Sequence, residues 1–236
     1  GECRICDNMD HDHGLPSLEE KSWDLCLTDP PWNIDKGGLP SGKNTVESRK
    51  DSIHAYNDQI TNYEVKMDIL FSFIRKISNY MYLFSGYSNL GFWLYNYRKF
   101  DVGYLIWVRV NSGIRAFNAF FNRQEPIITW GKPNRKPSGD VINIHLKNGF
   151  LREGEYIHPH PKQYDLIKLL VDESLPTSVI DPYLGSGTTA EVCESLGIHW
   201  IGYEIMKEYA PDIEKRIARG IEKYKHRDNS KQVKLF

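Results

Sequence analysis

Residues 25–32 read Leu-Cys-Leu-Thr-Asp-Pro-Pro-Trp and decide how the rest of the chain is interpreted. The first three residues are apolar, which is typical of a buried strand. Asp29 can accept a hydrogen bond, whereas the two prolines that follow donate none. Because Pro31 favours extended backbone at Pro30, the carbonyl of Pro30 is a second candidate acceptor. With the ring of Trp32 for stacking, the stretch suits a planar ring that carries an amino group; the simpler alternative is a strand that ends in a stiff turn.

Length and charge limit the class of protein. A chain of 236 residues favours one sizeable domain over two. Its formal net charge is -1, so contact with nucleic acid requires a local basic surface. No apolar run approaches the ~18 residues of a membrane span, and no secretory signal opens the chain. The chain starts at Gly1 without an initiator Met, which is compatible with preceding residues.

The cysteines raise the question of a metal site. They are scattered, as in a protein of a reducing cytoplasm: Cys3, Cys6, Cys26 and Cys193. The first two precede His11 and His13, and this cluster is one candidate for zinc. However, His-x-His is not the usual helical ligand spacing, and Asp10 and Asp12 favour a solvated turn. We therefore expect no metal.

A second informative stretch, residues 179–189, reads Val-Ile-Asp-Pro-Tyr-Leu-Gly-Ser-Gly-Thr-Thr. It is typical of a buried strand, a glycine-rich turn and a helix. Gly185 and Gly187 allow a ligand to approach the backbone closely, and the helix N-terminus favours a carboxylate. Glu204, at the end of the next expected strand, suits the two hydroxyls of a ribose. Because the third glycine of the dinucleotide fingerprint is missing, S-adenosylmethionine fits better than a pyrophosphate cofactor.

Together these stretches resemble the beta class of amino-group DNA methyltransferases. Residues 29–32 resemble its Asp-Pro-Pro-aromatic catalytic motif, and residues 181–189 resemble its Asp-Pro-Phe-x-Gly-Ser-Gly-Thr-Thr motif. Residues 158–163, His-Pro-His-Pro-Lys-Gln, are similar to the His-Pro-Thr-Gln-Lys-Pro segment of the class and match its first, second and fifth positions. The opening Gly-Glu-Cys resembles a Gly-Asp-Cys segment whose acid lies near the adenine of the cofactor.

The resemblance implies S-adenosylmethionine as the cofactor and two sets of site residues. The implied catalytic residues are Asp29, Pro30, Pro31 and Trp32. The implied cofactor-binding residues are Glu2, His158, Lys162, Asp181, Tyr183, Gly185, Ser186, Gly187, Thr188 and Glu204. Because the catalytic motif precedes the cofactor motif, the resemblance also implies a circularly permuted, Rossmann-like α/β fold. Its mixed seven-stranded sheet would carry helices on both faces.

The hydrophobic pattern agrees with alternating strands and helices, which predicts a parallel sheet covered on both faces. We expect strands at residues 1–3, 23–28, 80–84, 104–110, 126–130, 177–180 and 199–202. We expect helices at residues 65–77, 90–98, 161–171, 188–196 and 207–224. The division that follows is a single domain, residues 1–224, with a catalytic half (1–130), a short target-recognition insert (about 131–157) and a cofactor half (158–224), then a flexible tail (225–236).

The resemblance also suggests the reaction, which is methyl transfer to the N6 amine of a flipped adenine within a short DNA site. In that class, Asp at the first motif position goes mainly with adenine and Ser mainly with cytosine. Cytosine N4 is the alternative target, and an RNA methyltransferase or a catalytically silent DNA-binding subunit are further ones. We expect a cytoplasmic enzyme of a prokaryotic or phage-infected cell, of the restriction-modification type.

Basic residues in irregular segments are the candidates for contact with double-stranded DNA. They are Arg115, Arg123, Lys132, Arg135 and Lys136. Their segments are residues 111–123 and 131–156, and the second is short for a recognition domain, so a short site or a homodimer is expected. The long segment 33–62 is either a phosphate-contacting lid or a plain loop.

The last five residues, Gln232-Val233-Lys234-Leu235-Phe236, resemble the peptide by which bacterial replication and repair proteins dock on the sliding clamp. Two apolar side chains and a Gln amide on a tether suit such docking. In the alternative interpretation, Leu235 and Phe236 fold back onto the domain.

Overall fold

The computed structural model describes residues 1–31, 63–109, 114–115, 121–122, 124–144, 157–158 and 161–232. The strands are β1 (Glu2–Ile5), β2 (Trp23–Thr28), β3 (Ser78–Phe84), β4 (Gly103–Arg109), β5 (Ile114–Arg115), β6 (Phe121–Asn122), β7 (Gln124–Gly131), β8 (Val141–Ile144), β9 (Ser178–Asp181) and β10 (His199–Glu204). The α-helices are α2 (Tyr63–Ile77), α3 (Leu90–Asn96), α4 (Tyr164–Ser174), α5 (Thr188–Leu196) and α6 (Ala210–Gln232). Short 3-10 helices include η1 (Leu15–Ser17) and η4 (Lys207–Tyr209).

The main sheet is mixed and has the strand order β1-β10-β9-β2-β3-β7-β4-β8. The neighbours from β1 to β3 are parallel, whereas β7 runs antiparallel to both β3 and β4. The expected Rossmann-like α/β fold is confirmed, with β2 from the catalytic half directly beside β9 from the cofactor half. Within the described residues the sheet has eight strands, however, and not seven, because β8 forms in a segment that we expected to be irregular.

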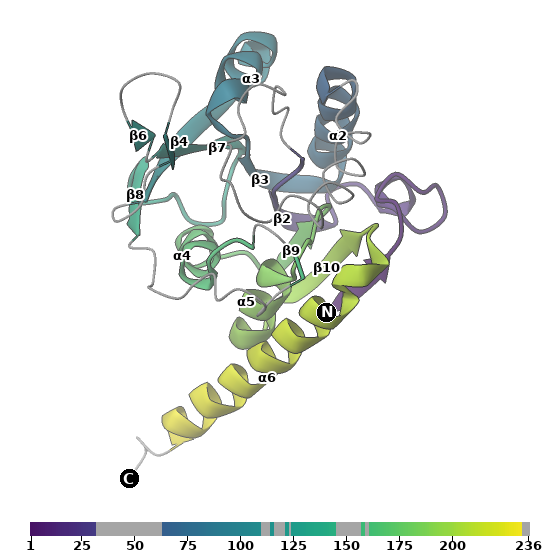
Figure 1. Cartoon of the computed structure of the whole chain (residues 1–236), viewed down its shortest axis with the longest axis vertical. Helices are drawn as coiled ribbons and strands as arrows, with labels where there is room; N and C mark the ends of the chain where they lie inside the picture. The colour runs from purple at the N-terminus through teal and green to yellow at the C-terminus, as the bar shows by residue number, and fades with distance from the viewer. Residues whose placement is uncertain are drawn as a thin grey trace, which may run out of the picture.

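Alternation along the central strands directs apolar side chains to both faces of the sheet. Helices lie against both faces (Figure 1). On β3, Tyr80, Tyr82 and Phe84 join a core cluster with residues of α4, α5 and α6. The intervening Met81 and Leu83 join the opposite cluster with residues of η1, α2 and α3. The sheet is therefore covered on both faces, and its edges remain for ligands.

The last helix is longer than its expected range. Helix α6 continues to Gln232, so the tail expected to be flexible from residue 225 is helical as far as that residue. Residues 221–232 contain neither Gly nor Pro and many Lys, Arg, Glu and Gln residues, which favour a helix. Figure 1 shows α6 running past the body of the molecule. Within the ranges described above, no helix has the length and apolarity to cross a membrane.

Candidate active site

Acidic side chains gather at one edge of the sheet, where the parallel strands end. Asp29 follows β2, Asp181 is the last residue of β9, and Glu204 is the last residue of β10. Glu125 reaches the same edge from the other direction, because β7 is antiparallel and begins there. A cleft at this edge is lined by Leu27, Asp29, Phe84, His158, Pro161, Lys162, Ile167, Asp181, Tyr183, Leu184, Gly185, Ser186, Thr188 and Thr189. Open α/β sheets bind ligands at this edge.

The glycine-rich turn between β9 and α5 requires its glycines. Gly185 and Gly187 have φ angles of 54° and 85°, in the left-handed region that side chains disfavour. A Cβ on Gly187 would lie 3.0 Å from Cα of Ile213, and one on Gly185 would lie 3.0 Å from Nε2 of His158. The turn therefore brings bare backbone and the N-terminus of α5 into the cleft, as the sequence predicted.

Glu204 holds this turn from the neighbouring strand. Its Oε2 accepts the backbone N–H of Gly185 and its Oε1 accepts that of Met206, both at 2.8 Å. Burial raises the pKa of Glu204, although these backbone hydrogen bonds act to lower it. A carboxylate has about four acceptor positions, so Glu204 can fix the turn and still accept hydroxyls from a ligand.

Asp181 supports the same turn through two hydrogen bonds that its side chain accepts. Its Oδ1 accepts the backbone N–H of Tyr183 at 3.0 Å, and its Oδ2 accepts the hydroxyl of Thr189 at 2.7 Å. The side chain is buried, and burial raises its pKa from 3.8 to about 7. The structure thus gives Asp181 a clear part in shaping the cofactor turn.

The most unusual group in the cleft is a chain of three charges. Nζ of Lys162 lies 2.9 Å from Oδ2 of Asp29 and 2.8 Å from Oε1 of Glu125. The exposed fractions of the side chains fall from 27% for Asp29 through 15% for Lys162 to 4% for Glu125. Burial acts to lower the pKa of Lys162, but the charges of Asp29 and Glu125 raise it above its ordinary value. Lys162 is therefore a cation directly beside the expected catalytic carboxylate.

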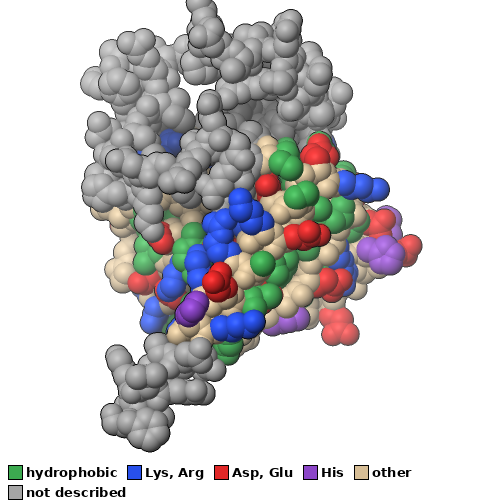
Figure 2. All heavy atoms as spheres, turned by 60° about the horizontal axis from the view of Figure 1, so that its bottom comes forward, with side chains coloured by type: hydrophobic (Ala, Val, Ile, Leu, Met, Phe, Trp, Pro, Cys, Tyr) green, Lys and Arg blue, Asp and Glu red, His purple; other side chains and the backbone are tan. Residues whose placement is uncertain are grey.

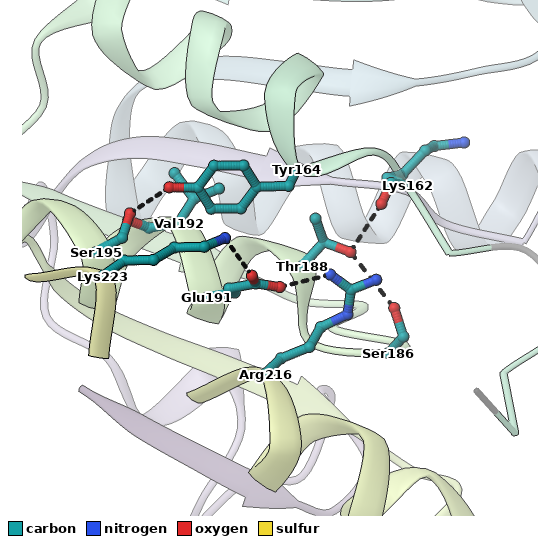
Figure 3. A network of polar contacts seen from close by, with 9 residues as sticks. All are labelled: Lys162, Tyr164, Ser186, Thr188, Glu191, Val192, Ser195, Arg216 and Lys223. Atoms are coloured by element: carbon teal, nitrogen blue, oxygen red, sulfur yellow. Dashed lines mark hydrogen bonds and ion pairs between the residues drawn. The ribbon is translucent and has the colours of Figure 1, made fainter. Parts of the chain in front are cut away.

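The helix that follows the turn is fixed by a buried ion network (Figure 3). Glu191 on α5 is almost fully buried and pairs with Arg216 at 2.7 Å and with Lys223 at 2.6 Å, both on α6. At the start of α5, the hydroxyl of Thr188 donates to the backbone carbonyl of Lys162 at 3.0 Å. These contacts fix the N-terminus of α5 relative to its neighbours.

Several expected site residues lie together at the cleft. Pro30 and Pro31 follow β2 beside Asp29, and the cleft is lined by Asp181, Tyr183, Gly185, Ser186 and Thr188. His158 also lines the cleft, and its ring packs edge to face on Tyr209 with centroids 4.8 Å apart. Trp32 lies outside the described residues.

The expected role of Glu2 in cofactor binding is not supported by its position. It begins β1 and pairs with Ile201 in the register of β10, so it lies away from the carboxyl end of its strand. Its carboxylate accepts Nε of Arg4 at 2.8 Å, and it is absent from the lining of the cleft. The structure therefore does not bring Glu2 to the cofactor cleft, because the strand continues for three residues beyond it.

The basic segment after β7, which we expected to contact DNA, makes other contacts in the structure. Backbone N–H of Lys132 donates to the carbonyl of Asn79 at the start of β3, at the edge opposite the cleft. Arg135 caps the C-terminus of α4: its Nε donates to the carbonyl of Glu173 at 3.1 Å, and its guanidinium also donates to that of Asp172. Lys132 and Arg135 thus make structural contacts at the opposite end of the strands from the cleft.

Of the other expected DNA contacts, Arg115 lies in β5, within the connection between β4 and β7, and Arg123 lies outside the described residues. Because β4 ends and β7 begins at the edge of the cleft, this connection leaves the sheet on the side that the site requires. On the face shown in Figure 2, Lys and Arg side chains gather in a band near the centre, with separate Asp and Glu side chains around it.

Two residues of the site were missed from sequence. Glu125 precedes an apolar strand, and an acid at that position was the only signal of its part in the cleft. The buried Asn8 donates from Nδ2 to the carbonyl of Pro182 at 2.8 Å and joins the loop after β1 to the cofactor turn. In the parts of the chain that the structure describes, no group of three or more His, Cys, Asp or Glu residues is arranged to hold a metal ion.

Comparison with known proteins agrees with this geometry. A family model described as DNA methylase matches residues 132–215. The chain is 24% identical over 235 residues to the Type II methyltransferase M2.LlaDCHI of Lactococcus lactis subsp. cremoris, with 87% of this chain and 86% of that protein covered. It is also 24% identical over 233 residues to the Type II methyltransferase M2.DpnII of Streptococcus pneumoniae, with 86% and 85% covered. The comparisons support a DNA methyltransferase.

Solved DNA methyltransferase structures share the fold. The M1.HpyAVI–SAM complex matches with a TM-score of 0.59 at 17% identity, covering 92% of this chain and 98% of that chain. PvuII DNA methyltransferase, described as cytosine-N4-specific, matches with a TM-score of 0.60 at 14% identity, covering 94% and 90%. The first of these proteins is complexed with S-adenosylmethionine, the methyl donor that the sequence motifs of this chain indicate.

Proposed function

We propose that this chain transfers a methyl group from S-adenosylmethionine to the N6 amine of adenine in a short DNA site. The observation that carries the proposal is the adjacency of β2 and β9, whose pairing runs through Leu25 with Val179 and Cys26 with Ile180. This pairing places Asp29 and the glycine-rich turn on the two sides of one cleft. A methyl acceptor and a methyl donor must meet in such an arrangement.

The residues of the cleft fit S-adenosylmethionine. The N-terminus of α5 suits the carboxylate of the methionine part, and Glu204 suits the hydroxyls of the ribose. Leu27, Phe84 and Leu184 provide an apolar wall. When bound, this cofactor supplies a methyl group on a sulfonium, which departs as a neutral thioether.

The catalytic part falls to Asp29 and Pro30. An exocyclic amine is a weak nucleophile because its lone pair is delocalised into the ring. Asp29 and the carbonyl of Pro30 would accept its two hydrogens, so that the nitrogen becomes pyramidal and its lone pair is freed. Asp29 and the carbonyl of Pro30 would thus direct the lone pair toward the methyl group of the donor, and the proton that the methylated nitrogen must lose would pass to the carboxylate of Asp29 or to water. Positioning in line contributes several kcal/mol.

The target base must leave the duplex to reach Asp29. Unstacking and unpairing a base costs a few kcal/mol, and stacking on Trp32 would offset part of that cost. The chain between β4 and β7, together with the segment at residues 33–62, is our candidate for contact with the target site. Lys132 and Arg135 instead bond to backbone at the opposite end of the strands.

Cytosine N4 is the second candidate target, because the PvuII enzyme described as cytosine-N4-specific shares the fold. The same acceptors would serve either amine, so chemistry alone does not choose between them. Our preference for adenine rests on Asp29 at the first position of the motif.

Nucleoside analysis tests the proposal. The purified protein would be incubated with S-adenosylmethionine and, in parallel, with unmethylated duplex DNA, single-stranded DNA and RNA, followed by digestion and mass spectrometry. We expect N6-methyldeoxyadenosine from duplex DNA and none with Asp29→Ala, whose cofactor affinity should be nearly unchanged. Methylcytosine would move the assignment to N4, whereas methylation of RNA alone, or full activity of the Ala variant, would contradict the proposal.

We further propose two partners beyond double-stranded DNA. A homodimer would extend the contact with DNA beyond what the short recognition segments provide. Gln232 and the following residues would dock on a sliding clamp; residues 233–236 lie outside the described residues. Deleting residues 232–236 should abolish clamp binding while melting temperature and activity on bare DNA persist. A large loss of melting temperature would instead favour an apolar end that packs on the domain.

A further inference from the structure

The contacts of Lys162 differ from those expected of a cofactor ligand. Its ammonium lies between a carboxylate of the catalytic stretch and a carboxylate of β7, at 2.9 Å from Asp29 and 2.8 Å from Glu125. Its Nζ also lies 4.7 Å from the centroid of the Phe84 ring, which forms one wall of the cleft. The ammonium is thus held from three directions beside the acid that would receive the target amine.

We propose that Lys162 is a positioning residue for methyl transfer, which holds Asp29 in place as an ionised acceptor, and that Glu125 holds Lys162. This inference rests on the proposed function and deepens it. Lys162 contacts Oδ2 of Asp29, and a carboxylate has acceptor positions on both oxygens. Asp29 can therefore be fixed by Lys162 and accept the amine at the same time.

Glu125 explains why the cation does not oppose the reaction. The amine gains positive charge as it is methylated, and a lone ammonium nearby would disfavour that change. Two carboxylates and one ammonium instead give the group of Asp29, Lys162 and Glu125 a net charge of −1. Glu125 is almost fully buried, with 4% of its side chain exposed, and a buried carboxylate requires such a partner.

The backbone of Lys162 adds a link to the cofactor side. Its carbonyl accepts the hydroxyl of Thr188, the first residue of α5, at 3.0 Å. Figure 3 shows this carbonyl facing Thr188 while the side chain of Lys162 points away from it. One residue therefore touches the turn that would hold the methyl donor through its backbone and the methyl-acceptor site through its side chain. A small error in this distance is costly, since a misplacement of ~1 Å can reduce a rate by ~10²-fold.

The charged groups around Asp29 predict opposite pH effects for two substitutions. Among the described residues, they include Lys162, Glu125 behind it, and Asp181, on which the charge of Asp29 acts. Lys162→Met removes the cation, so Asp29 becomes easier to protonate and the acidic limb of the pH–rate profile should move up by about one unit or more. Glu125→Gln removes a negative charge, so Asp29 becomes harder to protonate and the acidic limb should move to lower pH.

Single-turnover methylation of duplex DNA from pH 5 to 9, at saturating cofactor, measures both effects, with cofactor affinity from calorimetry. We expect Lys162→Met to lower the rate ~10²-fold with cofactor affinity nearly unchanged. Lys162→Arg, which can contact both carboxylates, should recover most of the rate. Glu125→Gln should lower it less. Lys168→Met, which removes an ammonium paired with Asp172 on α4, is the matched control and should match the wild type.

The possible outcomes separate this inference from the proposed function. Full activity and an unmoved acidic limb in Lys162→Met would overturn the inference while the methyltransferase assignment stands. A loss of cofactor affinity that accounts for the whole rate loss would also overturn it, since Lys162 would then be a cofactor ligand. If Lys162→Met does not fold, Glu125→Gln decides alone. A downward shift of the acidic limb of its pH–rate profile supports the inference, and an unmoved limb overturns it. No methyl transfer by the wild type would overturn both proposals.

Discussion

Oε2 of Glu204 accepts the backbone N–H of Gly185 at 2.8 Å, which joins the end of β10 to the turn after β9. Glu204, which the sequence assigned to the ribose of the cofactor, therefore also supports the glycine-rich turn. Its second oxygen, Oε1, accepts the N–H of Met206. Loss of this side chain would leave two backbone donors without their acceptor.

We expect Glu204→Ala to weaken cofactor binding and to lower the melting temperature together. An unsatisfied backbone donor costs about 1–3 kcal/mol, and the turn would lose its tie to β10. Calorimetric titration with S-adenosylmethionine and thermal unfolding measure the two effects. Glu208→Ala, on the exposed part of η4, is the control and should change neither. Unchanged cofactor affinity in Glu204→Ala would remove Glu204 from the cofactor site.

Gly187→Ala should destabilise the fold. The residue has a φ of 85°, and a Cβ would lie 3.0 Å from Cα of Ile213 on α6. Backbone strain of this kind costs of order 1–3 kcal/mol, and the displaced turn should also bind the cofactor less tightly. Gly91→Ala is a matched control, because its Cβ would meet open space within α3, where Ala favours the helix by roughly 0.5–1 kcal/mol. If Gly187→Ala and Gly91→Ala had equal melting temperatures, the expected backbone strain at residue 187 would be contradicted.

Asp181 should make the protein more stable as the pH falls from 8 to 5. Burial raises its pKa from 3.8 to about 7, so in this range the folded protein holds a proton that the unfolded chain does not. Asp181→Asn removes this dependence, and its amide retains partners in the N–H of Tyr183 and the hydroxyl of Thr189. The melting temperature of the variant relative to the wild type should therefore increase from pH 5 to pH 8. A constant difference would show that Asp181 is ionised throughout.

Asp24 serves as the control for Asp181, because its pKa is lowered on folding whereas that of Asp181 is raised. Partial burial acts to raise its pKa, but hydrogen bonds from the hydroxyl and the N–H of Thr177, both at 2.7 Å, lower it below the ordinary value. Its contribution to stability is present at neutral pH and is lost as the pH falls below about 4. Asp24→Asn should therefore be less stable than the wild type at pH 7, by a difference that shrinks at acid pH.

Arg135→Ala should lower stability without changing DNA binding. Its guanidinium donates to carbonyl groups at the end of α4, and a cation there also interacts favourably with the helix dipole. DNA affinity and its dependence on salt should match those of the wild type, and the exposed neighbour Lys136→Ala should match it in both measurements. Weaker DNA binding by Arg135→Ala, with a smaller salt slope, would return this segment to the DNA contact.

The sequence predicted what local pattern determines. Apolar strands that alternate with amphipathic helices indicated a sheet covered on both faces, and the glycines of the turn after β9 indicated a ligand cleft, whereas the mixed character of the sheet was implied only by the family resemblance. It did not predict β8, because Val141–Ile144 alternates between exposed and half-buried residues and becomes a strand only beside β4. Similarly, the basic composition of residues 132–136 carries no information about which edge of the sheet they occupy.

Glu125 was missed for a related reason. Its position beside Lys162 follows from the antiparallel direction of β7, which is a property of the whole sheet and of no local motif. Lys162 was recognised as a site residue, but its direction toward Asp29 depends on the same strand. Residues whose part is set by pairing between distant segments are those for which a structure adds most.

The connection between β4 and β7 has a consequence for evolution. The strands pair up to Val108 with Gln124, so the connection leaves and re-enters the sheet at neighbouring positions. Its length can change with little entropic cost, since each doubling of a loop costs only ~0.6 kcal/mol. Under the proposed function, exchange of this segment between related enzymes would alter the DNA sequence that is read, while the sheet, the acid and the donor site are inherited unchanged.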